Sequence, residues 1–163
     1  MNQDGKPARG GRNLTVNRKA SHDYSILEKL EAGIELLGTE VKVVRNGEAG
    51  LAGAYAKVDN GQLFLQQVSI PPYEFGNRFN HDTLRNRRLL VHRKEIRRLQ
   101  ALQEQKGMAL IPLRLYLNNR GIVKVELAVC RGKAQEDRRE TIRSREADRD
   151  AARAIASHGR GRE

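Results

Sequence analysis

The sequence predicts a mainly β fold, a small closed antiparallel OB-like β-barrel of the five-stranded nucleic-acid-binding type, with two or three flanking helices. Short apolar runs recur between residues 21 and 130, and turn residues separate them. Asp59-Asn60-Gly61 joins two of these runs, and Asn-Gly between apolar runs is a strong signal for a β-hairpin. A β-sandwich or an SH3-like barrel would suit the same pattern, so both remain alternatives.

The apolar runs place the strands in order along the chain. One strand begins at Tyr24, and others are expected over 34–37, 54–58, 62–70, 109–117 and 122–130. Large apolar residues alternate from Val123 to Val129, which is typical of a strand with one buried face. The turn at 118–121 predicts a second hairpin between the last two strands.

Two helices interrupt the strands. A short helix is expected over 40–45, with Thr39 as its N-terminal cap and Asn46-Gly47 closing it. A longer one is expected over 93–106, where Ile96, Leu99 and Leu102 recur at helical spacing and Gly107 follows the last turn.

The composition indicates a polyanionic partner. The 163 residues include 31 Lys and Arg against 20 Asp and Glu, a formal net charge of +11. Nucleic acids and anionic membranes attract such a protein. No apolar run approaches the roughly 18 residues that span a bilayer, and no apolar secretory segment is apparent, so we expect a cytoplasmic protein without a membrane partner. The single cysteine, Cys130, can form no internal disulfide and is expected to be buried.

Three segments are expected: a basic disordered N-terminal arm (1–16), the OB-like barrel (17–130) and a charged C-terminal tail (131–163). Nearly all large apolar residues lie in the middle segment, so the ends cannot bury enough surface to fold alone. Opposite charges three residues apart in the tail favour a helix that would be marginal in water. The tail is therefore predicted to be disordered when free and helical inside a polyanionic channel. A plain solubilising tail is the alternative.

The positive charge is densest between residues 78 and 98, which predicts a phosphate-binding surface rather than a solvated helix face. Its basic residues are Arg78, Arg85, Arg87, Arg88, Arg93, Lys94, Arg97 and Arg98. Aromatic residues are few, and most of Tyr24, Tyr55, Phe64 and Tyr116 fall in strand patterns and are expected in the core. Without a track of exposed rings for stacking, recognition of folded RNA by shape and backbone contact is favoured.

The sequence offers no catalytic constellation. Its four histidines form no metal-binding pair, and His81-Asp82 lacks an accompanying nucleophile motif. We therefore expect no enzyme, no metal ion and no cofactor.

A series of short motifs runs along residues 17–145, each weak alone but highly specific in this order and spacing. They are Asn17-Arg18-Lys19-Ala20, His22-Asp23-Tyr24, Glu31-Ala32-Gly33, Gly38-Thr39-Glu40-Val41-Lys42, Pro72-Tyr73-Glu74, Asn80-His81-Asp82, Leu89-Leu90, Lys124-Val125-Glu126-Leu127, Gly132-Lys133 and Asp137-Arg138-Arg139. In these motifs the chain resembles the SsrA-binding protein family, also called small protein B.

The resemblance implies a small barrel that binds the transfer-RNA-like domain of transfer-messenger RNA, in place of a missing anticodon stem. It also implies delivery of that RNA to stalled ribosomes for trans-translation, with release of the ribosome and tagging of the nascent chain. The C-terminal tail would enter the empty messenger channel near the decoding region of the small subunit and fold there as a helix. Elongation factor Tu would be a further partner, and a monomer is expected.

The resemblance also implies residues for these contacts. It implies Glu31, Lys42, Arg45, Leu90 and His92 as RNA-binding residues, and the charge of the basic segment adds Arg87 and Arg88 to the expected set. Expected ribosome-binding residues of the tail are Gly132, Lys133, Asp137, Arg138 and Arg139. A core position for Leu90 and a structural salt bridge for Glu31 are the alternatives.

Four positions depart from the family pattern. Glu136 stands where an aromatic residue or histidine is common, and Ala134 where lysine is usual; Thr83 and Val43 replace a common proline and serine. Glu136 puts one stacking contact of the tail in question, and Ala134 puts one phosphate contact in question. The other reading of the whole sequence is a structural ribosomal protein with basic tails.

Overall fold

The computed structural model describes residues 11–76, 80–133 and 135–158. The chain divides after Gly132 into two compact units. The boundary lies two residues later than the sequence predicts, because the last strand continues to Gly132.

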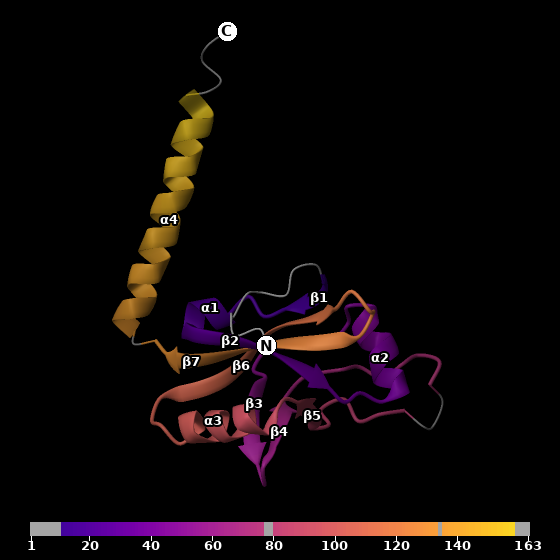
Figure 1. The fold of residues 1–163 in the computed structure, drawn as a ribbon. Helices are drawn as coiled ribbons and strands as arrows, with labels where there is room; N and C mark the ends of the chain where they lie inside the picture. The colour runs from indigo at the N-terminus through magenta and orange to yellow at the C-terminus, as the bar shows by residue number, and fades with distance from the viewer. Residues whose placement is uncertain (1–10, 77–79, 134, 159–163) are drawn as a thin grey trace. The chain divides into compact units, whose positions relative to one another are not determined.

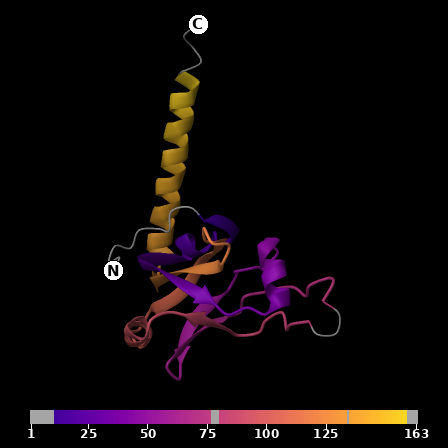
Figure 2. The ribbon, with the colours of Figure 1, turned by 45° about the vertical axis from the view of Figure 1, so that its right-hand side comes forward.

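The first unit is a closed antiparallel barrel (Figures 1 and 2). Its strands are β1 Arg12–Val16, β2 Tyr24–Ile34, β3 Tyr55–Asp59, β4 Gln62–Gln66, β5 Arg87–Leu90, β6 Met108–Leu117 and β7 Val123–Gly132. They follow the order β1-β6-β3-β4-β5-β2-β7, and a further pairing of β6 with β7 closes the ring. The predicted mainly β, closed antiparallel barrel is confirmed, with six strands in the ring.

Two strands differ from the sequence-based prediction. β1 lies in the segment predicted to be a disordered arm, yet it pairs with β6 from Arg12 opposite Leu117 to Val16 opposite Arg114. Main-chain pairing to a long strand needs few apolar side chains, so composition did not reveal it. β2 is one strand of 11 residues, not two. Residues 1–10 of the predicted arm lie outside the described residues.

Three helices flank the barrel: α1 Ala20–Asp23, α2 Gly38–Arg45 and α3 Arg93–Gln103. Thr39 was wrongly predicted to cap α2. The cap residue is Leu37, whose N–H donates to the Glu40 carboxylate at 2.9 Å, while the Thr39 hydroxyl lies 2.8 Å from Nδ1 of His81. α3 stops three residues short of its predicted end, before Gly107 with its φ of +83°.

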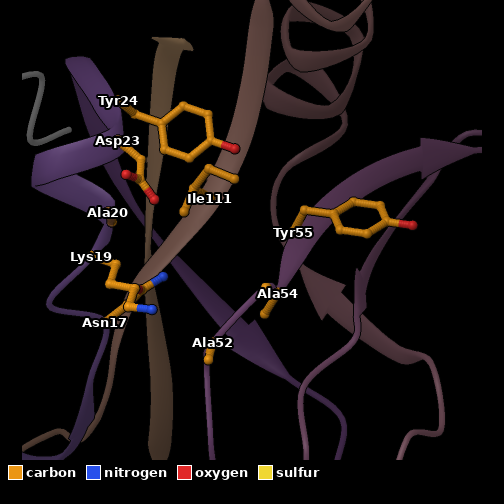
Figure 3. Close-up of a pocket in the computed structure, with 10 residues that line it drawn as sticks. Asn17, Lys19, Ala20, Asp23, Tyr24, Ala52, Ala54, Tyr55 and Ile111 are labelled. Carbon is orange, nitrogen blue, oxygen red and sulfur yellow. The ribbon is translucent and has the colours of Figure 1, made fainter. Parts of the chain in front are cut away.

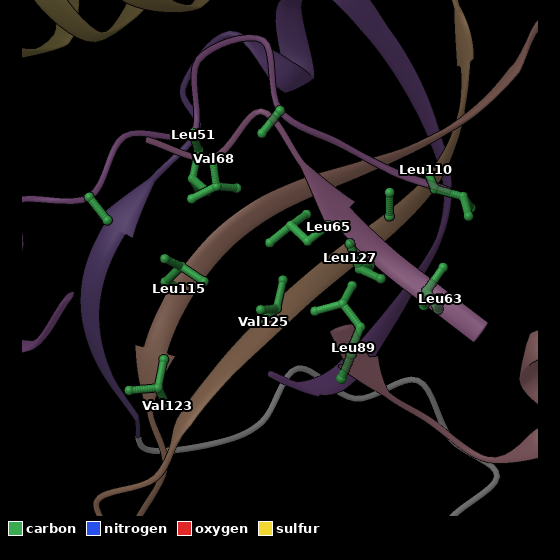
Figure 4. Packing of buried hydrophobic residues seen from close by; sticks show 14 of the residues in the cluster. Leu51, Leu63, Leu65, Val68, Leu89, Leu110, Leu115, Val123, Val125 and Leu127 are labelled. Atoms are coloured by element: carbon green, nitrogen blue, oxygen red, sulfur yellow. The ribbon is translucent and has the colours of Figure 1, made fainter. Parts of the chain in front are cut away.

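The barrel interior is filled by aliphatic side chains from nearly every strand (Figure 4). Leu63, Leu65, Val125 and Leu127 are fully buried, and Leu99 of α3 joins the same core. A smaller cluster under α1 contains Cys130, whose burial was predicted. Burial raises the pKa of the Cys130 thiol to about 11, which keeps it protonated and unreactive at neutral pH.

A buried ion pair ties α2 to β5. Glu40 and Arg87 are both fully buried, and the Glu40 carboxylate accepts from Arg87 at 2.6 Å and from Arg85 at 2.5 Å. Arg87 also donates to the carbonyls of Val68, Asp82 and Thr83. The guanidinium thus holds together the helix, the strand and the loop between β4 and β5.

Glu40→Gln is expected to lower the free energy of unfolding by about 3–5 kcal/mol, because it leaves the Arg87 charge buried without its counter-charge. Thermal or urea unfolding monitored by circular dichroism measures the effect. The matched control is Glu35→Gln, which removes an exposed carboxylate 3.7 Å from Arg88 and should cost below about 1 kcal/mol. Equal costs for the two variants would contradict the structural role of Glu40.

The same ion pair makes the stability of the fold depend on pH. Burial alone would raise the pKa of Glu40, but the Leu37 N–H and the two guanidinium groups outweigh it, so the pKa lies below its ordinary value of 4.5. The stabilisation is therefore present above pH 4.5 and is lost as the pH falls through the lowered pKa. The difference in stability between the native chain and Glu40→Gln should shrink steadily in unfolding measurements below pH 4.5.

Candidate nucleic-acid interface

The structure separates the basic segment into structural and free cations. Arg87 was predicted to bind RNA, but it is fully buried and its donors are used inside the fold, so it cannot contact a ligand directly. Arg85 is held by Glu40, and Arg98 donates to Glu28 of β2 at 2.5 Å. Arg78 lies outside the described residues. Each of these three described arginines is paired with a carboxylate, and Arg87 is fully buried, whereas Arg98 stays exposed beside Glu28.

The exposed cations are Arg88 on β5 and Arg93, Lys94, Arg97 and Arg98 on α3, of which Arg88 and Arg98 have carboxylate partners. Arg88 lies 3.7 Å from the Glu35 carboxylate, with about half of each side chain exposed. Such a pair is weak and leaves the guanidinium free to exchange partners.

Leu90 is exposed, so the alternative of a core position is wrong. Residues of β5 alternate between the two faces, with Arg87 and Leu89 buried and Arg88 and Leu90 outside. Leu90 is 47% exposed and covers Gly33 of β2, where an added Cβ would lie 3.2 Å from that of Leu90. His92 follows at the N-terminus of α3 and is also exposed.

Glu31 lies on β2 in the same sheet. The Tyr116 hydroxyl donates to its carboxylate, and burial together with Glu31 raises the pKa of that hydroxyl. No salt bridge to Glu31 is present within the described part of the chain, so the structural salt bridge considered from sequence is not formed. Glu31 remains exposed and can accept further hydrogen bonds.

Lys42 and Arg45 project from α2, and both are exposed. The Lys42 ammonium lies 4.9 Å from the centre of the Tyr73 ring. The Arg45 guanidinium donates to the Gly121 carbonyl at 2.8 Å, which fastens α2 to the turn between β6 and β7. Arg45 therefore has a structural role whether or not it binds a ligand.

The aromatic residues are less buried than the sequence predicted. Of the four strand aromatics only Tyr116 is in the interior; Tyr24 and Phe64 are half-buried and Tyr55 is 38% exposed. Sequence reasoning also missed Phe75, which is 75% exposed and makes an edge-on ring contact with Tyr73. A lone aromatic residue in a loop carries no periodic signal, so only its setting in the structure reveals it.

A small pocket of about 150 Å³ lies beside α1. Figure 3 shows residues 17–24 on one side, residues 52–55 on the other and Ile111 between them. Two of its polar side chains are engaged within the fold, because Asn17 donates to the Pro112 carbonyl at 3.0 Å and Asp23 pairs with His22 at 2.9 Å.

The second unit is the helix α4, Gln135–His158. Asp150 and Arg153 form one of the predicted pairs three residues apart, at 3.8 Å. Gly132 and Lys133 precede the helix, and Arg139 is exposed on it. The side chains of Ala134, Glu136, Asp137 and Arg138 are outside the described set. The predicted helix is present, and its dependence on a bound partner stays a prediction.

No group of three metal-ligating side chains converges in the described ranges 11–76, 80–133 and 135–158. His81, the histidine that could have suggested a general base, instead lies in the fold with Nε2 2.9 Å from the carbonyls of Ile70 and Pro71. None of the described helices has the length and apolar character needed to cross a membrane.

Comparisons with known proteins agree on one family. The family model described as SmpB protein matches residues 14–157. The SsrA-binding protein of Moorella thermoacetica is 55% identical over 142 residues, 87% of this chain and 92% of the relative. That of Pelotomaculum thermopropionicum is 53% identical over 142 residues, with the same coverage. A solved structure described as "tmRNA-SmpB: a journey to the center of the bacterial ribosome" is 47% identical with a TM-score of 0.63, and covers 78% of this chain and 93% of the other.

Proposed function

The chain belongs to the SmpB protein family, and we propose on that premise that it binds the transfer-RNA-like domain of transfer-messenger RNA and delivers it to stalled ribosomes. The relatives are named SsrA-binding proteins, and the description of the similar solved structure names tmRNA, SmpB and the bacterial ribosome. The chain spans more than nine-tenths of the Moorella relative, so the comparison extends over barrel and tail alike.

The observation that carries the proposal is the outward face of β2 and β5 with the start of α3. Glu31, Arg88, Leu90 and His92 are all exposed there on rigid strands or at a helix end. This surface combines a carboxylate, an apolar side chain, a guanidinium and an imidazole. It suits a folded RNA, because ribose hydroxyls can donate hydrogen bonds to the carboxylate and phosphates can accept them from the guanidinium. We propose Lys42 and Arg45 as weaker RNA contacts. Arg87 is not proposed as an RNA contact, because its side chain is fully buried.

The tail is proposed to act separately from the barrel. Its 24-residue helix has exposed charged side chains along most of its described length. Such a helix finds no core to stabilise it, but a narrow anionic channel would supply counter-charge to its arginines. We propose that it occupies the empty messenger channel, with Gly132, Lys133, Asp137, Arg138 and Arg139 near the decoding region.

Three further features complete the proposal. The protein acts as a cytoplasmic monomer, it shares its RNA with elongation factor Tu during delivery, and it contributes binding rather than catalysis. The buried and internally bonded His81 supports the last point, since it leaves that imidazole in a structural role.

Affinity purification of the tagged full-length chain from bacterial extract, followed by sequencing of the bound RNA, tests the identity of the partner. Transfer-messenger RNA is expected to be enriched far above its share of total RNA, while the ribosomal RNA recovered should be sub-stoichiometric. Recovery of ribosomal RNA alone would favour a structural ribosomal protein instead.

Leu90→Ala is expected to weaken binding of the transfer-RNA-like domain by about tenfold with a change in stability below about 1 kcal/mol, because the side chain is outside the core. Leu89→Ala is the matched control: Leu89 is 2% exposed, so its truncation should cost about 2–5 kcal/mol of unfolding free energy. At a temperature where both variants are folded, Leu89→Ala should retain native affinity. Fluorescence anisotropy gives the affinity, and loss of affinity in the Leu89 variant alone would reverse the assignment.

Disruption of the tail helix is expected to spare RNA capture and abolish rescue. Glu146→Pro breaks a helix interior at a cost of about 3 kcal/mol, whereas Glu146→Ala at the same exposed position retains it. Anisotropy should give unchanged RNA affinity for both, and tagging of a nascent chain on a truncated message in a reconstituted translation system should fail for the proline variant only. A proline variant that tags normally would rule out a helical requirement.

A further inference from the structure

A groove with a cationic rim lies between the β3–β4 turn and α3. Its volume is about 580 Å³, within the range of pockets that hold small ligands. Arg88, Arg93 and Arg97 line it, and the half-buried side chains of Val91 and Ile96 contribute apolar surface. No aspartate or glutamate is among the described residues that line the groove.

Side-chain hydrogen bonds, a buried leucine and a tight turn fix the walls of the groove. The Gln103 carboxamide of α3 accepts from the Val58 N–H of β3 at 2.8 Å and donates to the Val58 carbonyl at 3.4 Å. Leu99 of α3 is fully buried in the barrel core. The β3–β4 turn carries Asn60 and Gly61 at φ of +48° and +71°, the tight turn that holds two antiparallel strands in register. The groove is therefore pre-formed.

The cations of the rim are available to a ligand. Arg93 and Arg97 are four residues apart on α3, so they project from one face about 6 Å apart along the helix axis. Neither has an ion-pair partner among the residues that the structure describes, in contrast to Arg98 on the same helix with its Glu28 partner. Arg88 completes the rim with its weak contact to Glu35.

The chemistry of this lining suits an RNA strand better than an acidic peptide. An arginine guanidinium can donate two parallel hydrogen bonds to a phosphate. Apolar side chains can pack against the face of a base or ribose. The carboxamides of Gln62 and Gln100, which also line the groove, can both donate to and accept from a base edge. An acidic peptide could pair its carboxylates with the arginines and its backbone with the amides, but its charged side chains offer little to the apolar surface of Val91 and Ile96.

We propose that this groove is a second RNA contact, which holds a short single-stranded segment with its phosphates on Arg93 and Arg97 and a base or ribose on Val91 and Ile96. The proposal rests on the proposed function for the source of the RNA and extends it beyond the β2–β5 face. Val91 lies between Leu90 and His92 in the chain, so a strand leaving that face would reach the groove directly.

The test compares Arg93→Gln/Arg97→Gln with Lys57→Gln/Lys106→Gln in the full-length chain. Both double variants lose two charges at exposed positions, but the control lysines do not line the groove. With the transfer-RNA-like domain as ligand, the groove variant should bind about tenfold or more weakly and the slope of log affinity against log salt should fall by about 1.5–2. The control should lose no more than about twofold. Equal losses in the two variants would mean diffuse electrostatic attraction and overturn the proposal.

A second measurement tests RNA binding in the groove independently of the proposed function. Methyl resonances of Val91 and Ile96 are followed by NMR as a four-nucleotide oligoribonucleotide is added, with a glutamate-rich peptide as the competing ligand. Shifts centred on these methyls with the oligoribonucleotide, and absent in the Arg93→Gln/Arg97→Gln variant, support the groove even if transfer-messenger RNA proves not to be the partner. Shifts caused by the peptide alone, or no shifts with either ligand, would overturn it.

Discussion

The buried Glu40–Arg87 pair is the constraint on which the exposed face depends. Arg87 is the first residue of β5, and residues of a strand alternate between faces. Because Arg87 must point inward to reach Glu40, Leu89 also points inward, and Arg88 and Leu90 point outward. A shift of β5 by one residue would bury Arg88 and Leu90 in place of Arg87 and Leu89. The ion pair thus fixes the register that gives the surface its chemistry.

Local patterns in the sequence were enough to predict much of the barrel. Asn-Gly at 60–61 and the turn at 118–121 lie between paired strands as expected, and Leu99 lies on the buried face of the predicted helix. These signals are local, since turn residues and periodic apolar residues act over a few positions. β1 could not be predicted in this way, because its stability comes from main-chain pairing with residues about a hundred positions away.

The candidate site was less predictable for a related reason. In the sequence, Arg85, Arg87, Arg88, Arg97 and Arg98 are equivalent cations, and only the fold brings Glu40 and Glu28 to three of them. The carboxylates that claim these arginines are 45, 47 and 70 residues away in the chain, beyond the reach of any local pattern. Density of charge along a sequence therefore overstates the charge available at a surface, and tertiary pairing decides which cations remain for a ligand.

The two units of the chain are ordered by different interactions. The barrel closes a ring of strands around an aliphatic core, so the backbone positions of Glu31, Leu90 and the groove arginines are set before any RNA arrives, and the entropy lost there on binding is mainly that of side chains. The tail helix has exposed charges and no core of its own, so much of its stabilisation must come from the surroundings it enters. A pre-formed surface favours tight capture, whereas the proposed conditional helix would make ordering depend on a vacant channel. On this proposal the same net positive charge would serve two separable steps, because only one of them is backed by a hydrophobic core.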